Sequence, residues 1–487
     1  MSLKTSVITS LVWKFLERIG TQGVQFVVAI ILARLLSPAD FGLIALVTVF
    51  ITVANVFVHS GLNTALIQKK DADDVDFSTV FFSSLAIALI IYGALFLGAP
   101  LLADFFNDQK ILIPVARVLG LILFLGAINS AQEAYIARNM MFKKLFYRSI
   151  GAIIPSGFLG IVLAYLDFGI WALVGQQLMN SILVCVIMWF TVKWRPRLVF
   201  SFARFKVLFS FGWKLLCSAL IDTLYRNVFD LVIGKLFSPA SLGYYNRGDQ
   251  FPKVIILNIN TSIQSVLLPS LSSVQDDKSR LKSLARRSIK TSSFLILPMM
   301  AGLAAVASPF TMVVLGEKWL PAVPFIQICC FSYAFWPIHT TNLVAINAVG
   351  RSDVFLKLEI LKKGVALVAL VLVIWMFRTP VGIAMSAAIT APLGSFINAY
   401  PNKKLLDYGF VEQMKDFLPS FILSLVMGIG VYWLLNVFDV NPILQIVSLV
   451  IVGASFYFGV AKLLRFECFD YIVNSIKEMV GKEKRRV

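Results

Sequence analysis

Long apolar runs separated by short polar connections organise the whole chain. A helix needs about 20 mostly apolar residues to cross the hydrocarbon core of a bilayer, and about fourteen runs of this kind follow one another here. They lie near residues 8–36, 40–67, 77–103, 111–137, 146–167 and 169–192, then 207–237, 241–272, 288–314, 320–349, 357–377 and 379–401, and finally 415–437 and 442–464. The pattern predicts an all-α integral membrane protein with about 14 transmembrane helices.

The composition supports this prediction and excludes a soluble enzyme. Of the 487 residues, 59% are hydrophobic and 14% are charged, with a mean hydropathy of +0.83. A soluble domain carries about 25% charged residues. The five cysteines and two histidines have no metal-ligand spacing, so we expect neither a metal site nor a cofactor.

The charges are few but strongly basic, with 44 Lys and Arg against 26 Asp and Glu and a net charge of +18. With the spans above, about 32 cations fall in the even-numbered connections and the tail, and about five in the odd-numbered connections, as the positive-inside rule requires. Both termini are then cytoplasmic. The excess reflects topology and attraction to anionic membrane lipids, and it does not indicate a nucleic-acid partner.

Spans one to six and seven to twelve are two copies of one unit. The segment Ala33–Gly42 recurs as Gly234–Gly243, and Trp13–Leu16 recurs as Trp213–Leu216. Because six spans is an even number, both copies enter from the same side and the repeat is parallel, an architecture typical of transporters. A scaffold that merely duplicated is the alternative. The predicted parts are an N-lobe (1–192), a basic cytoplasmic linker (193–206), a C-lobe (207–403), spans thirteen and fourteen (404–466) and a basic cytoplasmic tail (467–487).

Charged residues inside the spans are candidates for function, because a charge at bilayer depth costs at least about 2.5–3.5 kcal/mol and normally faces a cavity or a partner. Span seven carries Asp222, Arg226 and Asp230 at positions i, i+4 and i+8, which share one face of a continuous helix. Their counterparts in span one are Thr21 and Gln25. Matching polar stripes predict two walls of a common cavity, although the three charges could simply neutralise one another.

Other polar residues extend this pattern. Lys14 and Arg18 lie two to three turns into span one, where an interfacial role and a cavity role are both open. His59 in span two has Asn260 as its counterpart in span eight, where Asn258 is also polar. His59 and Glu133, in span four, are candidates for proton coupling, with structural hydrogen bonding as the alternative. Lys214 lies near the predicted cytoplasmic end of span seven.

These sequence features resemble the polysaccharide transporters of the multidrug/oligosaccharidyl-lipid/polysaccharide exporter superfamily, and in particular the colanic-acid exporter type of flippase. The resemblance covers nearly the whole chain. It is carried by Ala33–Gly42, by Gly243–Arg247, by Leu268–Asp277 and by Gly316–Trp319. It implies two six-helix lobes around a central cavity, alternating access, and a further pair of spans that guides a lipid tail.

The resemblance also implies a substrate, an undecaprenyl-diphosphate-linked oligosaccharide repeat unit of an exopolysaccharide, capsule or O-antigen, moved across the bacterial inner membrane. Arginine suits a diphosphate because it offers several donors and keeps its charge. We expect Arg226 to bind it, with Arg18, Lys14 and Lys214 nearer the cytoplasmic mouth, and amides such as Gln25, Asn258 and Asn260 to meet sugar hydroxyls. Other polysaccharide assembly proteins are possible partners.

Two alternative functions remain open at this stage. A multidrug or cation antiporter of the same superfamily would favour an acidic cavity, whereas cations here at least balance the acids. A membrane-embedded polymerase would need a long outward loop with catalytic residues, and the predicted connections are short. We therefore expect a transporter and not an enzyme.

Overall fold

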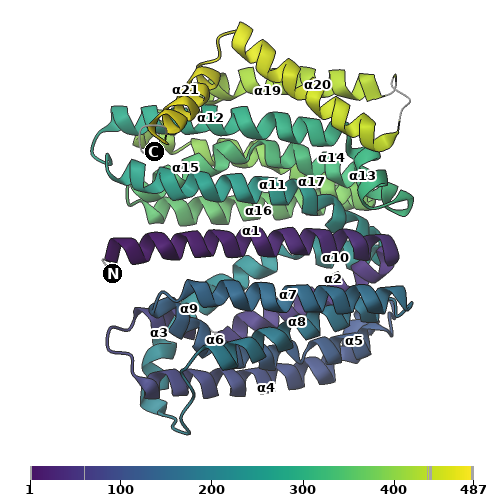
Figure 1. Cartoon of the computed structure of the whole chain (residues 1–487), viewed down its shortest axis with the longest axis vertical. Helices are drawn as coiled ribbons and strands as arrows, with labels where there is room; N and C mark the ends of the chain where they lie inside the picture. Colours follow the sequence, from purple (N-terminus) through teal and green to yellow (C-terminus); the bar gives the residue numbers. More distant parts are fainter. Residues whose placement is uncertain (1–2, 60, 436, 438–440, 484–487) are drawn as a thin grey trace. The chain divides into compact units, whose positions relative to one another are not determined.

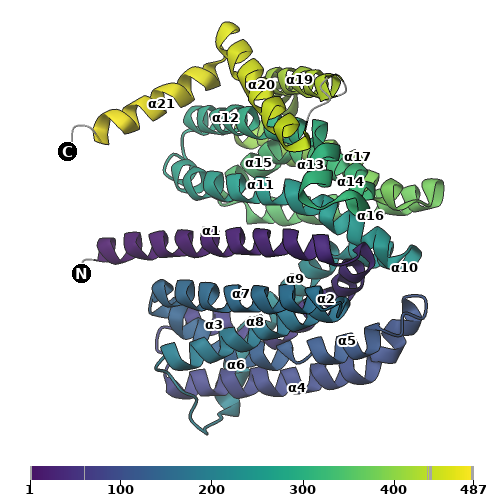
Figure 2. The same cartoon turned by 45° about the vertical axis from the view of Figure 1, so that its right-hand side comes forward.

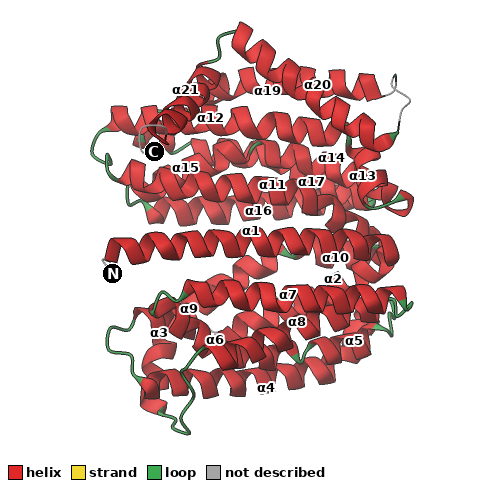
Figure 3. Ribbon diagram, in the orientation of Figure 1, coloured by secondary structure: helices red, strands yellow, loops and turns green. Residues whose placement is uncertain are grey.

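Helices account for all of the regular structure that is described. The computed structural model describes residues 3–59, 61–435, 437 and 441–483, and in this part of the chain every regular element is helical (Figure 1, Figure 3). Within these residues, 14 helical segments are long and apolar enough to cross a membrane. The predicted fold class and number of spans are confirmed.

The chain divides after Gly243 into two compact units. The first contains α1 (Leu3–Leu35), α2 (Pro38–His59), α3 (Leu62–Gln68), α4 (Asp74–Phe105), α5 (Leu112–Leu119), α6 (Ile122–Arg138), α7 (Phe142–Tyr165), α8 (Ile170–Thr191), α9 (Phe202–Arg226), α10 (Val228–Leu236) and the first residues of α11 (Pro239–Ser272). The helices of span seven therefore fall in the first unit. The predicted end of the N-lobe at residue 192 and the predicted start of the C-lobe at residue 207 stay predictions.

The second unit contains the remainder of α11 and all later elements. These are α12 (Lys278–Ala305), α13 (Ala307–Val314), the 3-10 helix η1 (Glu317–Ala322), α14 (Val323–Ala334), α15 (Trp336–Ala348), α16 (Ser352–Phe377), α17 (Pro380–Ala399), α18 (Asn402–Leu405), α19 (Phe410–Leu435), α20 (Pro442–Leu463) and α21 (Glu467–Glu483). In Figure 2, α21 leaves the end of α20 at a wide angle.

Capping side chains set the start of α4. Asp73 is extended at φ −111° and ψ 178°, and its carboxylate accepts hydrogen bonds from the backbone N–H groups of Val75 and Asp76 at 3.1 and 3.0 Å. The Asp76 carboxylate in turn accepts from the Asp73 N–H at 3.2 Å. Three N–H groups that the helix itself cannot satisfy are thus paired, which stabilises the end of a 32-residue helix.

Several predicted spans consist of two helices rather than one. The second span is divided between α2 and α3 at Gly61, whose φ of 66° is easily adopted only without a Cβ. The seventh span is interrupted at Asn227, where φ is −100° and ψ is 6°. The expectation of one uninterrupted helix across 207–237 is therefore wrong, because residue 227 leaves the helical conformation.

Apolar side chains from α3, α4, α6 and α8 form a core of the first unit. Leu66, Val80, Ala131 and Met188 are each at most 1% exposed. Trp194, in the basic linker, packs against Phe77 of α4 with ring centroids 5.6 Å apart. The linker is therefore anchored to the first unit by an aromatic side chain in that core.

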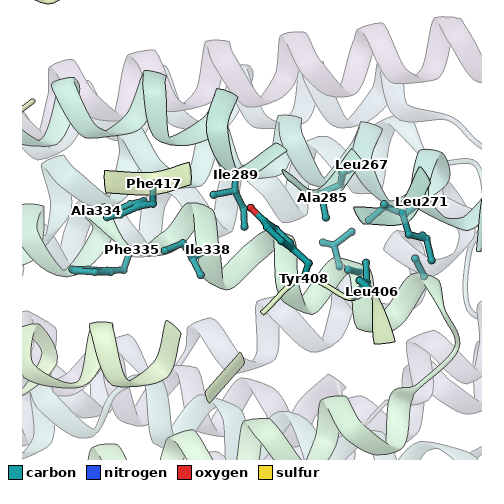
Figure 4. Packing of buried hydrophobic residues seen from close by; sticks show 14 of the residues in the cluster. Leu267, Leu271, Ala285, Ile289, Ala334, Phe335, Ile338, Leu406, Tyr408 and Phe417 are labelled. Carbon is teal, nitrogen blue, oxygen red and sulfur yellow. The ribbon is translucent and has the colours of Figure 1, made fainter. Parts of the chain in front are cut away.

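A corresponding core in the second unit joins α12, α14, α15 and α19. Figure 4 shows Ile289, Ile338, Phe417 and Tyr408 converging in this cluster, and each is at most 1% exposed. Phe417 stacks on Phe335 with centroids 5.6 Å apart. Span thirteen, formed by α19, is thus an integral part of the second unit.

Candidate functional site

An exposed ion pair lies near the end of α9. Arg226 Nε is 2.7 Å from Asp222 Oδ2, one helical turn away, and the two side chains are 76% and 43% exposed. α9 ends at Arg226, and Asn227 follows with φ −100° and ψ 6°; its backbone N–H and its side-chain amide both donate to the Thr223 carbonyl. The structure thus joins two of the predicted site residues in a charged pair on a largely apolar span.

Lys214 lies on α9, the helix that carries this pair, whereas Asp230 lies on α10. Asp230 lies in the first turn of α10, beyond the interruption at Asn227. Lys214 is exposed on α9, whereas Leu208 and Gly212 are buried. A Cβ added at Gly61 would lie 2.5 Å from the Gly212 carbonyl oxygen, so α9 and the start of α3 approach very closely.

The polar residues of α1 lie on a helix that packs along α7 (Figure 1, Figure 2). The Thr21 hydroxyl donates to the Glu17 carbonyl at 2.5 Å, and the Glu17 carboxylate accepts from the Ser149 hydroxyl at 2.7 Å. Arg18 is half-buried and Gln25 is exposed. The side chain of Lys14, which was predicted to contribute, lies outside the described residues.

The two ion-coupling candidates belong to a polar seam between α2, α3 and α6. The Asn63 amide lies 3.4 Å from His59 Nδ1 and accepts a hydrogen bond of 2.7 Å from Ser130. Glu133 forms an ion pair with Arg148 of α7 at 2.7 Å. Arg148 lies in the second turn of α7, which begins at Phe142.

In the second unit, the predicted amides lie on α11. The Asn258 amide donates to the Val254 carbonyl at 2.8 Å, and Asn258 and Asn260 are both half-buried. Two residues that are two positions apart on a helix with 3.6 residues per turn point in directions about 160° apart. They therefore face different surroundings, and a shared sugar-binding edge would need neighbouring helices to complete it.

A second charged pair on α11 was missed in the sequence. Lys253 Nζ lies 2.9 Å from Asp249 Oδ2, and the other oxygen of this carboxylate accepts from the Tyr333 hydroxyl at 2.6 Å. The Lys253 side chain is 53% exposed. The same i, i+4 spacing that identified Asp222 and Arg226 would have found this pair, because both repeat an acid one turn before a base inside an apolar run.

Comparison with known proteins places the chain among polysaccharide transporters. A family model described as "Polysaccharide biosynthesis protein" matches residues 31–324. The chain is 26% identical over 347 residues to the succinoglycan biosynthesis transport protein ExoT of Rhizobium meliloti, with 70% of this chain and 69% of that protein covered. It is 25% identical over 401 residues to the lipopolysaccharide biosynthesis protein WzxC of Escherichia coli, with 81% and 78% covered.

Solved structures of transporters share the fold. The inward closed conformation of the lipid II flippase MurJ superposes with a TM-score of 0.73 at 15% identity, covering 94% of this chain and 99% of that one. An inward-facing multidrug resistance transporter of the MATE family superposes with a TM-score of 0.59 at 17% identity, covering 80% and 96%. The predicted resemblance is confirmed, and so is the expectation of a transporter in place of an enzyme.

Proposed function

Since the chain belongs to the polysaccharide biosynthesis protein family, whose model covers more than half of its length, we propose that it moves lipid-linked oligosaccharide repeat units across the bacterial inner membrane by alternating access. Relatives named for succinoglycan, teichuronic acid and lipopolysaccharide biosynthesis support this class of substrate. The lipid carrier is an undecaprenyl diphosphate, so the cargo combines two phosphates, a sugar chain and a long apolar tail.

The exposed Asp222–Arg226 pair is the observation that carries the proposal. A guanidinium group in a membrane span is costly unless water or a partner surrounds it, yet 76% of the Arg226 side chain is exposed. Asp222 engages Nε, and an exposed guanidinium can offer its outer N–H groups to a phosphate in bidentate fashion. Asp222 orients Arg226, and the diphosphate binds beside it.

The other predicted residues are further candidates for binding the headgroup. Lys214 is exposed halfway along α9, the helix that ends at Arg226, and Arg18 and Lys14 of α1 are the other cations proposed for the diphosphate. Gln25, Asp230, Asn258 and Asn260 offer amide and carboxylate groups of the kind that bind sugar hydroxyls. The sugar chain then crosses in a hydrated space while the cations neutralise the diphosphate.

The apolar tail has a suitable surface in the second unit. A cavity of about 450 Å³ lies between α12, α19 and α20. Apolar side chains such as Phe294, Met427, Leu449 and Tyr457 line it. Since α19 and α20 form spans thirteen and fourteen, this groove supports their proposed role as a guide for the polyprenyl chain.

We infer the topology of the chain from its charge distribution. By the positive-inside rule we expect both termini in the cytoplasm, where we propose that the tail meets anionic lipids and other polysaccharide assembly proteins. His59 and Glu133 are the proposed ion-coupling pair. If protons drive the cycle through His59, transport in vesicles will depend on an imposed pH gradient, and His59→Gln will remove that dependence. His339→Gln is the matched control, since His339 is the second of the two histidines; a dependence that survives His59→Gln contradicts this assignment.

The central test measures translocation of a headgroup. Proteoliposomes are loaded with polyprenyl-diphosphate oligosaccharide that carries a fluorophore on the sugar, and a membrane-impermeant reductant reports the fraction in the outer leaflet. Arg226→Ala should reduce the rate at least tenfold, and Arg226→Lys should retain part of it because the charge remains. Arg280→Ala is the matched control, since Arg280 is 75% exposed and pairs with Asp277 at 3.3 Å outside this site.

The outcomes separate the binding assignment from the substrate class. If Arg226→Ala and Arg280→Ala translocate equally well, the diphosphate site is wrong. If the unmodified protein fails to move the labelled lipid but moves organic cations, the protein is a multidrug antiporter and the proposed function is wrong.

A further inference from the structure

The two copies of the repeated motif meet in a reciprocal glycine contact. A Cβ added at Gly42 would lie 1.7 Å from the carbonyl oxygen of Pro239, and a Cβ added at Gly243 would lie 2.0 Å from the carbonyl oxygen of Pro38. Both segments belong to the first unit. The backbones therefore approach as closely as glycine allows at two places.

The contact is symmetric with respect to the repeat. Pro38 and Pro239 are equivalent positions of the two motifs, and Gly42 and Gly243 are likewise equivalent. The glycine of each copy packs on the proline carbonyl of the other copy. This reciprocity is the mark of an isologous contact around a local twofold axis, here formed within one chain.

Each helix start is built in the same way around this contact. Proline is the first residue of both α2 and α11, which suits a position whose N–H has no partner in the helix. Before α2, the Asp40 carboxylate accepts hydrogen bonds from the Ser37 N–H and hydroxyl at 3.0 and 2.6 Å. Before α11, the Ser238 and Ser241 hydroxyls lie 3.0 Å apart. The turns are held rigidly, so the glycines cannot adjust independently.

The side chains next to the two glycines are also tightly packed. A Cβ added at Gly234 would lie 2.2 Å from the end of the Leu46 side chain, and Leu46 and Leu242 are 1% and 0% exposed. α10 packs beside α2 in both views (Figure 1, Figure 2). Close-packed interiors are not continuously deformable. The two motif segments are therefore either in contact at Gly42 and Gly243, as described, or separated.

We infer that the Gly42–Gly243 crossing is a latch that holds spans two and eight together at the non-cytoplasmic end, and that it must separate when this end opens. The inference rests on the proposed alternating-access function and on the sparse cations of the first and seventh connections, which place this end outside. Glycine is needed only in the closed state, because the contact that requires it is absent once the segments part. A methyl group at either position therefore disfavours the closed state selectively.

The size of the perturbation follows from the geometry. Cβ atoms essentially never approach another heavy atom within 3.0 Å, so an alanine at Gly42 or Gly243 would force the two backbones apart by about 1 Å or more. The obstructing atoms are backbone carbonyl oxygens, which cannot rotate away as a side chain can. One methyl group is thus enough to prevent closure.

The experiment measures the latch directly and does not depend on transport. Spin labels are placed at Leu35 and Leu236, which are 39% and 50% exposed, in a variant without the five native cysteines. Pulsed electron double resonance then gives the distribution of distances between them. Gly42→Ala and Gly243→Ala should each convert a short-distance population into a longer one. Gly98→Ala is the matched control, because a Cβ there would meet nothing within 4 Å.

A double variant distinguishes a latch from general destabilisation. Gly42→Ala and Gly243→Ala open the same contact, so together they should shift the distances little more than either alone. Unchanged distances in either single variant, or an equal shift in Gly98→Ala, would overturn the inference. If the glycine variants shift the distances while the unmodified protein moves no lipid-linked oligosaccharide, the latch stands and the proposed function fails.

Discussion

Asp416 should contribute more to the stability of the second unit than any exposed carboxylate near it. This residue of α19 is 6% exposed and binds three donors from other segments. Its carboxylate lies 2.8 Å from Arg286 Nε and 3.5 Å from Lys290 Nζ, both on α12, and it accepts a hydrogen bond of 2.8 Å from the Tyr408 hydroxyl. Burial and the nearby carboxylate keep the pKa of Tyr408 well above its ordinary value, so the phenol stays a donor at neutral pH.

The expected magnitude follows from this geometry. Removing one partner of a fully buried ion pair costs about 3–5 kcal/mol. Arg286 is 46% exposed and Lys290 is 21% exposed, so water compensates part of the loss and we expect about 2–3 kcal/mol for Asp416→Asn. The free energy of unfolding is measured by denaturant titration in detergent micelles, with circular dichroism as the signal.

A matched carboxylate provides the control. Asp407 is 87% exposed and lies 3.8 Å from Lys282, so Asp407→Asn should cost less than about 1 kcal/mol. Tyr408→Phe removes one hydrogen bond to a charged group, and its cost should not add fully to that of Asp416→Asn because both act on the same carboxylate. Equal losses for Asp416→Asn and Asp407→Asn would refute the reasoning.

Three further predictions concern other parts of the chain. The Asp76 backbone N–H and Arg204 lower the pKa of Asp73, so Asp73→Ala should cost about 1 kcal/mol at neutral pH. That difference in unfolding free energy should be complete above the ordinary Asp pKa and should shrink only as the pH falls through the lowered pKa of folded Asp73, so a difference that has already vanished at pH 5 would argue against it. Gly453→Ala should destabilise the packing of α20 on α19, because its Cβ would lie 3.0 Å from Val431, whereas Gly459→Ala, with open space around it, should be neutral in the same unfolding titration. Burial raises the pKa of Cys468 to about 11, so this thiol should react slowly with maleimide at pH 7 as followed by mass spectrometry, and rapid labelling of the folded protein would contradict its burial.

The spans and their number could be predicted from the sequence because each one is a local property. A run such as 442–464 is apolar over the thickness of a bilayer whatever surrounds it, and the corresponding helix is Pro442–Leu463. The charged pair in span seven was visible for the same reason, since residues four apart on a helix are neighbours. The interruption at Asn227 was not visible, because asparagine is tolerated in helices and the turn depends on local backbone geometry.

The sequence could not predict which charged residues form ion pairs across different helices. Arg148 lies near the start of the predicted span 146–167, and only the packing of α6 against α7 pairs it with Glu133. The basic linker looked like a topological signal, yet Arg197 and Arg204 pair with Asp74 and Asp73 at the start of α4. Ion pairs between residues far apart in the chain have no regular sequence spacing, so the sequence pattern does not predict them.

The sequence by itself determined that this is a membrane protein with fourteen spans, and it determined the repeat and the family resemblance. Hydropathy and repeated motifs are properties of the linear sequence and need no knowledge of tertiary contacts. Only the tertiary structure decided what the repeated motif does. Gly42 and Gly243 are far apart in the chain, and their requirement for glycine arises from a backbone carbonyl of the other copy. The requirement is steric. A residue without a Cβ is needed at these positions only because the tertiary structure brings the starts of two helices into contact there.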